Sequence, residues 1–359
     1  MPDVRIALAG VGNCASSLVQ GIAHYRDNNT VGLAHPDIGG YRVSDLVPVV
    51  AFDIDRRKVG RPLHEAVFAK PNCTTIFQPI LPDFGVTVKM GPVLDGVAEH
   101  MASYPDDRAF QPADQEPVDI ARALKESGAH VLICFLPVGA ERAARAYADA
   151  CLEAGVALVN CIPVFLASDK EYAAKFRARG LPMVGDDIKS QFGATLLHRM
   201  LTRTLCDRGA QPARTYQLNV GGNTDFLNML ERSRLVSKKQ SKTEAVQSQA
   251  DGHIQPSNIH IGPSDYVPWL EDNKLAFLRM EWLGFGSVPM NVEIRLSVED
   301  SPNSAGVVID AVRYAKLAMD RGIGGPLKAV SAYLMKRPPE QMRDDEARAL
   351  AEEFLSSSS

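Results

Sequence analysis

The chain has 359 residues and a net charge of -4, and 45% of its residues are hydrophobic and 23% charged. This composition is typical of a globular protein of about two domains, and it excludes a protein whose whole surface binds nucleic acid or an anionic membrane. The six cysteines show no C-x-x-C or zinc-finger spacing, so we interpret them as reduced thiols of a cytoplasmic protein. The N-terminus shows no signal peptide, and no apolar run reaches the ~18 residues of a membrane helix.

The first predicted elements enclose a glycine-rich turn. Residues 4–9, "VRIALA", predict a short apolar strand, and the following "GVGNCASSLVQGIAHY" turns into a helix. Gly10, Gly12 and Ala15 match the G-x-G-x-x-A fingerprint, in which glycine lets a dinucleotide pyrophosphate approach the helix N-terminus. An ordinary tight turn would have the same glycines, but the strand before and the helix after favour a nucleotide site.

The second predicted strand, "LVPVVAFDID", ends in Asp53 and Asp55. An acidic residue at this place binds the adenosine ribose hydroxyls and selects NAD over NADP. Asp53 follows the glycines by more than the usual gap of about 20 residues. We expect the segment "RDNNTVGLAHPDIGGYRVSD" to be an inserted loop that accounts for the excess. A solvated carboxylate at a strand end is the alternative.

Helices and short apolar strands then alternate. The predicted helices are "EPVDIARALKESG", "AERAARAYADACLEAG" and "SDKEYAAKFRARG", and the predicted strands are "HVLICFLPVG", "VALVNCIPVF" and "LPMVGDD". This order predicts an α/β fold with a Rossmann-like, doubly wound parallel sheet. Residues 70–115 contain scattered proline and glycine, and we expect an irregular excursion there.

The pattern changes after residue 210. "TYQLNV", "KLAFLRMEWLGFG" and "VPMNVEIRLSVED" alternate apolar and polar residues, which predicts an inserted α+β module whose sheet is covered on one face. "SPNSAGVVIDAVRYAKLAMDRG" predicts a helix that returns to the first domain. We therefore expect an NAD-binding domain over residues 1–200, a catalytic and oligomerisation domain over 201–300, and a returning C-terminal segment over 301–359.

Two segments collect polar residues that suit a binding site. "VGDDIKSQFGAT" places Asp186, Asp187, Lys189 and Ser190 where a parallel strand ends and a helix begins, a position that suits a ligand phosphate. Helix capping would explain the same residues. "NVGGNTDFLNM", which contains Asp225, follows a strand and suits a substrate loop, although a plain turn has the same composition.

The stretch "SKKQSK" concentrates three lysines in a slightly acidic chain. If it is helical, Lys238 and Lys242 lie on one face and Lys239 points about 100° away. Two like charges stacked in this way repel each other, so an anion between them would help to explain the spacing. On these residues alone, a solvated helix face is the simpler interpretation.

Seven segments together resemble one enzyme family. "GVGNCASSL", "VGDDIKSQFGAT", "LNVGGNTDFLNM", "SKKQSKTEAV", "GPSD", "DSPNSAGVVIDAVR" and "SAYLMKRPPE" occur in this order. They are similar to segments of the shorter bacterial forms of myo-inositol-1-phosphate synthase, also called inositol-3-phosphate synthase. The resemblance runs from residue 4 to the C-terminus. Since seven motifs in register are specific where each alone is not, the lysines are better interpreted as substrate ligands.

The resemblance implies an isomerase (an intramolecular lyase) that converts D-glucose 6-phosphate to 1L-myo-inositol 1-phosphate, the first step of inositol and inositol-phospholipid biosynthesis. In this family NAD is regenerated in each turnover. C5 is oxidised, C6 loses a proton, the resulting enolate attacks the C1 aldehyde, and the cyclic ketone is reduced. The family is tetrameric, so a homotetramer is implied, without a nucleic-acid or membrane partner.

The resemblance also implies roles for individual residues. The implied catalytic residues are Lys238, Lys242, Lys274, Lys336, Asp225 and Asp187. The implied cofactor-binding residues are Gly10, Val11, Gly12, Asn13, Cys14, Asp53, Pro137, Asp187, Lys189, Asp300 and Ser301. The implied substrate-binding residues are Ser190, Gln191, Asn223, Asp225, Lys238, Lys242 and Lys336. Ammonium groups at such places would stabilise oxyanions that develop on the sugar.

The chain departs from the longer, eukaryotic-type members at Asp265, where they carry a lysine, and Lys274 is the expected replacement. Shorter members often depend on a divalent cation, zinc or magnesium, and Asp300 and Ser301 are its expected oxygen ligands. Two competing hypotheses are an NAD-dependent dehydrogenase of similar fold, which would release NADH stoichiometrically, and a nucleotide-sensing Rossmann protein, which would not require the separated lysines.

Overall fold

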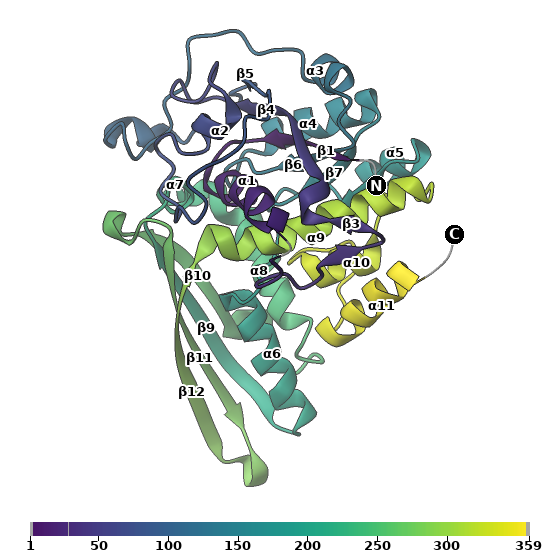
Figure 1. Cartoon of the computed structure of the whole chain (residues 1–359). Helices are drawn as coiled ribbons and strands as arrows, with labels where there is room; N and C mark the ends of the chain where they lie inside the picture. The colour runs from purple at the N-terminus through teal and green to yellow at the C-terminus, as the bar shows by residue number, and fades with distance from the viewer. Residues whose placement is uncertain (1–2, 28, 357–359) are drawn as a thin grey trace.

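The computed structural model describes residues 3–27 and 29–356, apart from the side chains of residues 263 and 264. Two large β-sheets with helices packed on them, and one small two-stranded hairpin, make up the fold (Figure 1). One sheet contains strands from both the N-terminal and the C-terminal part of the chain, and the other contains only strands between residues 211 and 299.

The first sheet has seven parallel strands, with β1 inside it. In sheet order the strands are β13 (Gly325–Pro326), β8 (Pro182–Val184), β7 (Ala157–Asn160), β6 (Val131–Cys134), β1 (Val4–Ala9), β4 (Leu46–Asp53) and β5 (Val88–Met90). From β1 the chain builds β4 and β5 on one side and then β6, β7 and β8 on the other. This order is doubly wound, and a ligand crevice lies where it reverses, at the carboxyl ends of β1 and β6. The predicted α/β, Rossmann-like fold is confirmed.

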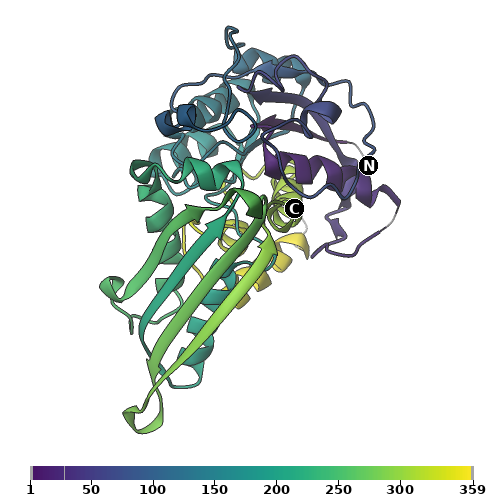
Figure 2. The ribbon, with the colours of Figure 1, turned by 90° about the vertical axis from the view of Figure 1, so that its left-hand side faces the viewer.

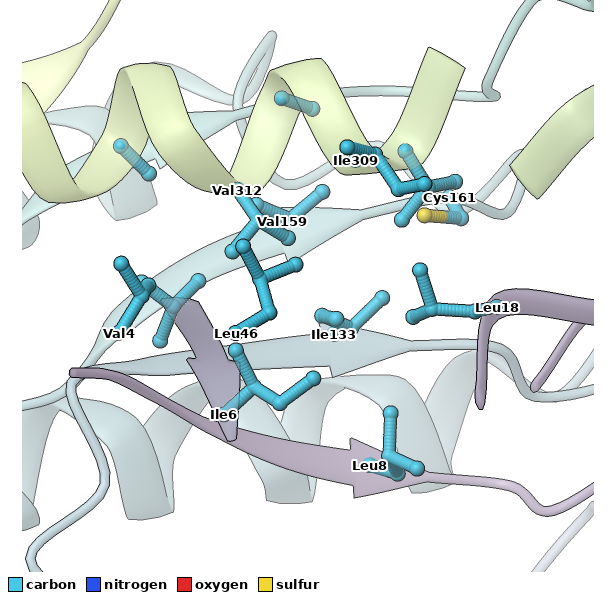
Figure 3. Packing of buried hydrophobic residues seen from close by; sticks show 14 of the residues in the cluster. Val4, Ile6, Leu8, Leu18, Leu46, Ile133, Val159, Cys161, Ile309 and Val312 are labelled. Carbon is cyan, nitrogen blue, oxygen red and sulfur yellow. The ribbon is translucent and has the colours of Figure 1, made fainter. Parts of the chain in front are cut away.

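Helices cover both faces of the first sheet. The helices on one face are α1 (Asn13–His24) and α9 (Asp300–Asp320), and those on the other are α3 (Ile120–Ser127), α4 (Glu141–Ala154) and α5 (Lys170–Ala178). Along β1, Ile6 and Leu8 pack toward α1 and α9 (Figure 3), whereas Ala7 and Ala9 pack toward α3 and α4. Because both faces are covered, the strand is apolar at nearly every position, as a buried parallel strand requires.

The second sheet has four strands in the order β10, β9, β11, β12. Their bounds are β9 (Gln211–Gly221), β10 (Ile259–Tyr266), β11 (Asn273–Leu283) and β12 (Pro289–Glu299). Helices α6 (Ala194–Asp207) and α8 (Val236–Gln247) pack against one face, and the sheet extends away from the rest of the molecule (Figure 2). Alternate residues of β12 are exposed. The prediction of a sheet covered on one face is therefore confirmed.

Helix α9 begins where β12 ends and returns to the first sheet, as the sequence predicts. The remaining helices and strands are α2 (Leu63–Ala66), α7 (Thr224–Asn228), α10 (Lys328–Leu334), α11 (Asp344–Ser356), β2 (Asp37–Ile38) and β3 (Tyr41–Arg42). The predicted domain boundary at residue 200 falls inside α6, which packs on the second sheet. We therefore propose that the second domain begins immediately before α6.

The two segments for which the sequence predicts an inserted loop or an irregular excursion contain little regular secondary structure. The inserted loop after α1 holds the short β2–β3 hairpin, and residues 70–115 hold β5 and a 3₁₀ helix, Glu99–Ser103. The sequence did not predict β5. All six cysteine thiols are free. Within residues 3–27 and 29–356, no helix is long and apolar enough to cross a membrane.

Candidate active site

One cavity lies at the carboxyl ends of the strands of the first sheet and reaches the helices of the second. Its volume is about 210 Å³. The glycine-rich turn, the ends of β4 and β6, the segments after β7 and β8, and parts of α6, α7, α8 and α9 contribute to its wall. The cavity thus brings together residues as distant in sequence as Gly10 and Lys336.

The glycine-rich turn leaves room for a ligand. Gly10 has φ +94°, and a Cβ there would lie 2.9 Å from the carbonyl oxygen of Phe135, so glycine is required. A Cβ on Gly12 would meet no atom within 4 Å. No side chain caps α1, and the Gly12 N–H finds no acceptor in the part of the chain that the structure describes. Free N–H groups with open space before them fit a dinucleotide pyrophosphate.

Asp53 stands beside this turn at the end of β4. Its Oδ2 accepts a hydrogen bond from the Val11 N–H at 2.7 Å, and its Oδ1 accepts from the N–H groups of Ile54 and Asp55 at 2.7 and 2.8 Å. Asp55 is fully buried, is paired with Arg57 and does not line the cavity. Of the two carboxylates at the strand end, Asp53 is therefore the one that faces the cavity.

The residues assigned to the cofactor lie almost entirely in the cavity wall. Those that line it are Gly10, Gly12, Asn13, Cys14, Asp53, Pro137, Asp187, Lys189, Asp300 and Ser301. Val11 is buried and is not part of the lining. Burial raises the pKa of the Cys14 thiol to about 12, so this thiol is protonated and suits packing rather than nucleophilic chemistry.

Four lysines converge on the opposite end of the cavity. Lys238 and Lys242 come from α8, Lys274 from β11, and Lys336 follows α10. The stretch "SKKQSK" is helical and lies in α8, with Lys238 half-buried, Lys242 buried and Lys239 exposed. The spacing of four residues therefore places Lys238 and Lys242 on the cavity side of α8.

Three of these lysines pair with three carboxylates. Lys238 Nζ donates to Asp225 Oδ2 at 3.1 Å, Lys274 Nζ to Asp300 Oδ1 at 3.0 Å, and Lys336 Nζ to Asp187 Oδ1 at 2.9 Å. Burial lowers the pKa of Lys238, but Asp225 and Asp187 outweigh it and raise that pKa. Each pair lies against the cavity. The carboxylates therefore fix three ammonium groups in place.

Lys242 differs from the other three lysines. Its side chain is 6% exposed, and it finds no hydrogen-bond or ion-pair partner among the residues described by the structure. Burial, and then the positive charges of Lys238, Lys274 and Lys336, hold its pKa well below the ordinary lysine value. A lysine whose pKa is lowered releases its proton more readily, so it can exchange a proton with a bound molecule.

The two aspartates of "VGDD" face different surroundings. Asp186 is buried and accepts hydrogen bonds from Asn160, the N–H groups of residues 166–168 and the Ser168 hydroxyl. Burial raises its pKa to about 6. Asp187 lines the cavity and accepts from Lys336 and from Ser241. Burial raises the pKa of Asp187, but Lys336 and Lys238 outweigh it, so the pKa is lowered.

Asp272 is a buried carboxylate that sequence reasoning missed. It accepts hydrogen bonds from Asn223 Nδ2 at 2.8 Å and from Ser301 Oγ at 2.9 Å, and it thereby orients two predicted site residues. Asn223 in turn caps α7 through its Oδ1. Burial raises the pKa of Asp272 to about 6. Its position two residues before Lys274 is the one signal that the sequence offered.

Two predicted residues point their side chains elsewhere. Lys189 Nζ donates to Asp344 and to two carbonyl oxygens near the end of α10, so its ammonium group lies in a buried ion pair with α11. Gln191 donates to the Gly32 carbonyl oxygen and lies against Gly306, in a neighbouring pocket. Ser190 remains in the cavity wall.

The expected metal ligands do not form a cluster. Asp300 is paired with Lys274, and the Ser301 hydroxyl donates to Asp272. Across residues 3–27 and 29–356, no group of three or more His, Cys, Asp or Glu side chains is placed to hold a metal ion. Two neighbouring oxygen donors fall short of the set that zinc or magnesium requires, so these residues do not fit a resident metal.

Comparisons with known proteins agree with this arrangement. A family profile described as "Myo-inositol-1-phosphate synthase" matches residues 193–301. The chain is 54% identical over 361 residues to a protein of Mycolicibacterium smegmatis named inositol-3-phosphate synthase, with 98% of each chain covered. It is 52% identical over 361 residues to the protein of that name from Corynebacterium glutamicum, again with 98% of each chain covered.

A solved structure has the same fold. The crystal structure titled "Ari2" superposes with a TM-score of 0.78 at 37% identity, and the match covers 99% of this chain and 98% of that one. With these relatives at more than half identity over nearly the whole length, the chain belongs to the myo-inositol-1-phosphate synthase family.

Proposed function

We propose that the chain converts D-glucose 6-phosphate to 1L-myo-inositol 1-phosphate, with NAD as a cofactor regenerated in each turnover. The observation that carries this proposal is the cavity, which has a cradle for a dinucleotide at one end and four converging lysines at the other. The names of relatives that are 52% and 54% identical over nearly the whole chain support the same activity.

The lysine end suits a sugar phosphate. Glucose 6-phosphate carries a phosphate dianion, and the start of α6 offers free N–H groups because no side chain caps that helix at Gly193. Ser190 lines the cavity close to Gly193. We propose that the phosphate binds at residues 190–195, with a lysine ammonium group as its counter-charge.

The cofactor end suits NAD. The N-terminus of α1, with Gly12 and Asn13 in the wall, would hold the pyrophosphate, and Asp53 would bind the adenosine ribose. When bound, NAD supplies the reversible oxidation of a secondary alcohol, here the C5 hydroxyl. A carbonyl at C5 makes the C6 protons acidic, so the later steps are proton transfer and carbon–carbon bond formation.

The four lysines suit these later steps. Negative charge develops on the C5 oxygen when C6 loses a proton, and on the C1 oxygen when C6 attacks the aldehyde. The ammonium groups of Lys238, Lys274 and Lys336 are fixed by carboxylates and stabilise such charge in a buried, weakly screened site. Lys242 has no carboxylate partner and a lowered pKa, so we propose it as the group that accepts and returns the proton.

The test is identification of the product. Purified protein is incubated with glucose 6-phosphate and NAD, and the products are analysed by phosphorus and carbon NMR. Formation of an inositol monophosphate supports the proposal. An oxidised sugar phosphate accompanied by NADH would indicate a dehydrogenase instead, and NAD binding without any conversion would indicate a nucleotide-sensing protein.

A homotetramer is the assembly that we propose, with much of its interface in residues 210–300. On the uncovered face of the second sheet, Leu218 and Phe277 lie opposite each other in register and are 41% and 37% exposed. Strand β12 is an edge strand of 11 residues. Exposed apolar side chains and a long free edge suit contact with another copy. Light scattering tests this, and a monomer of 39.0 kDa at micromolar concentration would contradict it.

We also propose a cytoplasmic location. Six free cysteines suit a reducing compartment, in which buried thiols stay unpaired. Fractionation of the source cells with antibodies against this chain tests the location, and recovery outside the cytoplasmic fraction would contradict it.

A further inference from the structure

A buried lysine lies against the glycine-rich turn and borders the same cavity, apart from the four lysines already described. Lys58 follows β4 and is 1% exposed. Its Nζ donates to the Val11 carbonyl oxygen at 2.9 Å and to Asn72 Oδ1 at 2.8 Å, and it lies 4.0 Å from Asp53 Oδ2. Burial lowers the pKa of Lys58, and Asp53 and Asp55 oppose this effect. A buried ammonium group needs such partners, and one of them, the Val11 carbonyl oxygen, belongs to the glycine-rich turn.

The peptide between Val11 and Gly12 is held from one side by two side chains. Its carbonyl oxygen also accepts from Asn72 Nδ2 at 3.0 Å, and Asn72 is itself oriented by donating to the Val67 carbonyl oxygen at 2.9 Å. In a trans peptide the C=O and N–H groups point in opposite directions. Holding the carbonyl oxygen toward Lys58 therefore turns the Gly12 N–H away from Lys58, and that N–H is the donor left without an acceptor in the described structure.

The peptide between Gly10 and Val11 is held by Asp53. The Val11 N–H donates to Asp53 Oδ2, and the positive charge of Lys58 lies beside the same oxygen. Lys58 thus contacts the turn through the Val11 carbonyl oxygen and through Asp53. Its Nζ thus has two acceptors that fix it against the turn, and its charge lies beside Asp53 at the border of the cavity.

From this geometry we propose that Lys58 and Asn72 are positioning residues for cofactor binding, which orient the Gly12 N–H toward the pyrophosphate and Asp53 toward the ribose. The inference rests on the proposed use of NAD. It predicts that these residues govern the affinity for NAD and leave the later chemical steps almost untouched, because neither reaches the lysine end of the cavity.

The test is calorimetric titration of NAD into the cofactor-free Lys58→Met variant, which keeps the length of the side chain and loses its charge and donors. We expect the Kd for NAD to rise by about tenfold or more, the loss typical of a hydrogen bond to a charged group. At saturating NAD the kcat should stay within about twofold of wild type, because interactions made only with the cofactor change affinity and not the chemical barrier. Arg56→Met is the matched control. Arg56 lies in the same segment after β4 as Lys58, but its side chain is exposed and paired with Asp106.

The outcomes separate this inference from the proposed function. A folded Lys58→Met variant that binds NAD as tightly as wild type would overturn the inference alone, as would a fall in kcat at unchanged Kd. If Lys58→Met does not fold, Asn72→Ser removes the second donor to Val11, and unchanged NAD affinity in that variant would overturn the inference. Wild-type protein that binds no NAD would overturn the proposed function and this inference with it.

Discussion

The two ends of the cavity are built in different ways. At the proposed cofactor end, the groups that we expect to bind NAD are mainly backbone N–H groups of one short turn, and neighbouring side chains such as Asp53 and Lys58 hold that turn in place. At the lysine end, the groups that we expect to bind the substrate are charged side chains from α8, β11 and the segment after α10. One added side chain can block a binding site formed by the backbone completely. Removing one of several charged side chains, in contrast, weakens the site only in part.

Gly12→Val tests the cofactor end and should have the largest effect. A Cβ on Gly12 meets no protein atom within 4 Å, so the variant should fold, but its side chain would occupy the space of the pyrophosphate. We expect NAD binding to be lost in calorimetry, and Gly12→Ala should lose less. Unchanged NAD affinity in folded Gly12→Val would show that the pyrophosphate lies elsewhere.

Alanine substitution tests the lysine end. For each of the four cavity lysines, Lys→Ala should lower turnover by ~10²-fold or more, the scale lost with one donor to a developing oxyanion. The substituted residues are Lys238, Lys242, Lys274 and Lys336. NAD affinity should remain close to wild type, because these lysines lie at the other end of the cavity.

Lys239→Ala is the control for these variants, because Lys239 is in the same helix but is exposed. Single-turnover assays should show nearly wild-type rates for it. The assignment of the lysine end would be wrong if Lys239→Ala were inactive while Lys238→Ala and Lys242→Ala turned over normally.

Asp53→Ala should have an intermediate effect at the cofactor end. The carboxylate is the proposed ribose acceptor, and it also holds the Val11 N–H at 2.7 Å. We expect the Kd for NAD to rise at least about tenfold, as for loss of a charged hydrogen-bond acceptor. NADP should be the poorer ligand of the wild type, since its extra phosphate would meet this carboxylate. Titration of both cofactors into both proteins decides the point, and tighter NADP binding by the wild type would contradict it.

The smallest effect concerns stability at the lysine end. The pKa of Lys242 is lowered in the folded protein, so below the ordinary lysine pKa of about 10.4 the unfolded chain binds this proton more readily. The free energy of unfolding therefore rises with pH, from the lowered pKa of Lys242 in the folded protein up to the ordinary lysine pKa. Lys242→Met should raise the melting temperature by about 2 °C at neutral pH, the shift that roughly 1 kcal/mol gives in a domain of this size. The gain should shrink toward pH 10.

Lys238→Met is the matched contrast in these melting experiments. Lys238 is paired with Asp225, so its removal leaves a carboxylate without its partner and should lower the melting temperature. Equal shifts of the same sign for both variants, measured by calorimetry across pH, would contradict the distinction between a paired and an unpaired lysine.

The sequence predicted most of the fold because its signals are local. The apolar run at Val4–Ala9, the glycines after it and the alternation after residue 210 each reflect neighbours in the chain, and the structure confirms the elements that they predict. Strand β5 was missed because it is three residues long and lies in a segment rich in proline and glycine. A short edge strand of this kind forms because β4 offers it a partner.

Many of the residues that line the cavity of the candidate active site could also be predicted, although no single motif identified them. Helical spacing alone separated Lys238 and Lys242 from Lys239, but their common cavity with Lys336 depends on tertiary packing. Asp272 was missed because its hydrogen bonds to Asn223 and Ser301 join three distant segments. Conversely, the side chains of Lys189 and Gln191 point away from the cavity, because a motif specifies a segment and not the direction of each side chain.

In the proposed reaction, NAD oxidises C5 before ring closure, and the NADH so formed reduces the cyclic ketone afterwards, so the two hydride transfers cancel and the reaction needs no net oxidant. The most direct measurement is therefore a turnover experiment with NAD far below the concentration of glucose 6-phosphate, in which inositol phosphate and NADH are measured together. We expect product to rise well beyond the amount of NAD while NADH does not accumulate. Product that stops at the amount of NAD, with an equal amount of NADH, would contradict it.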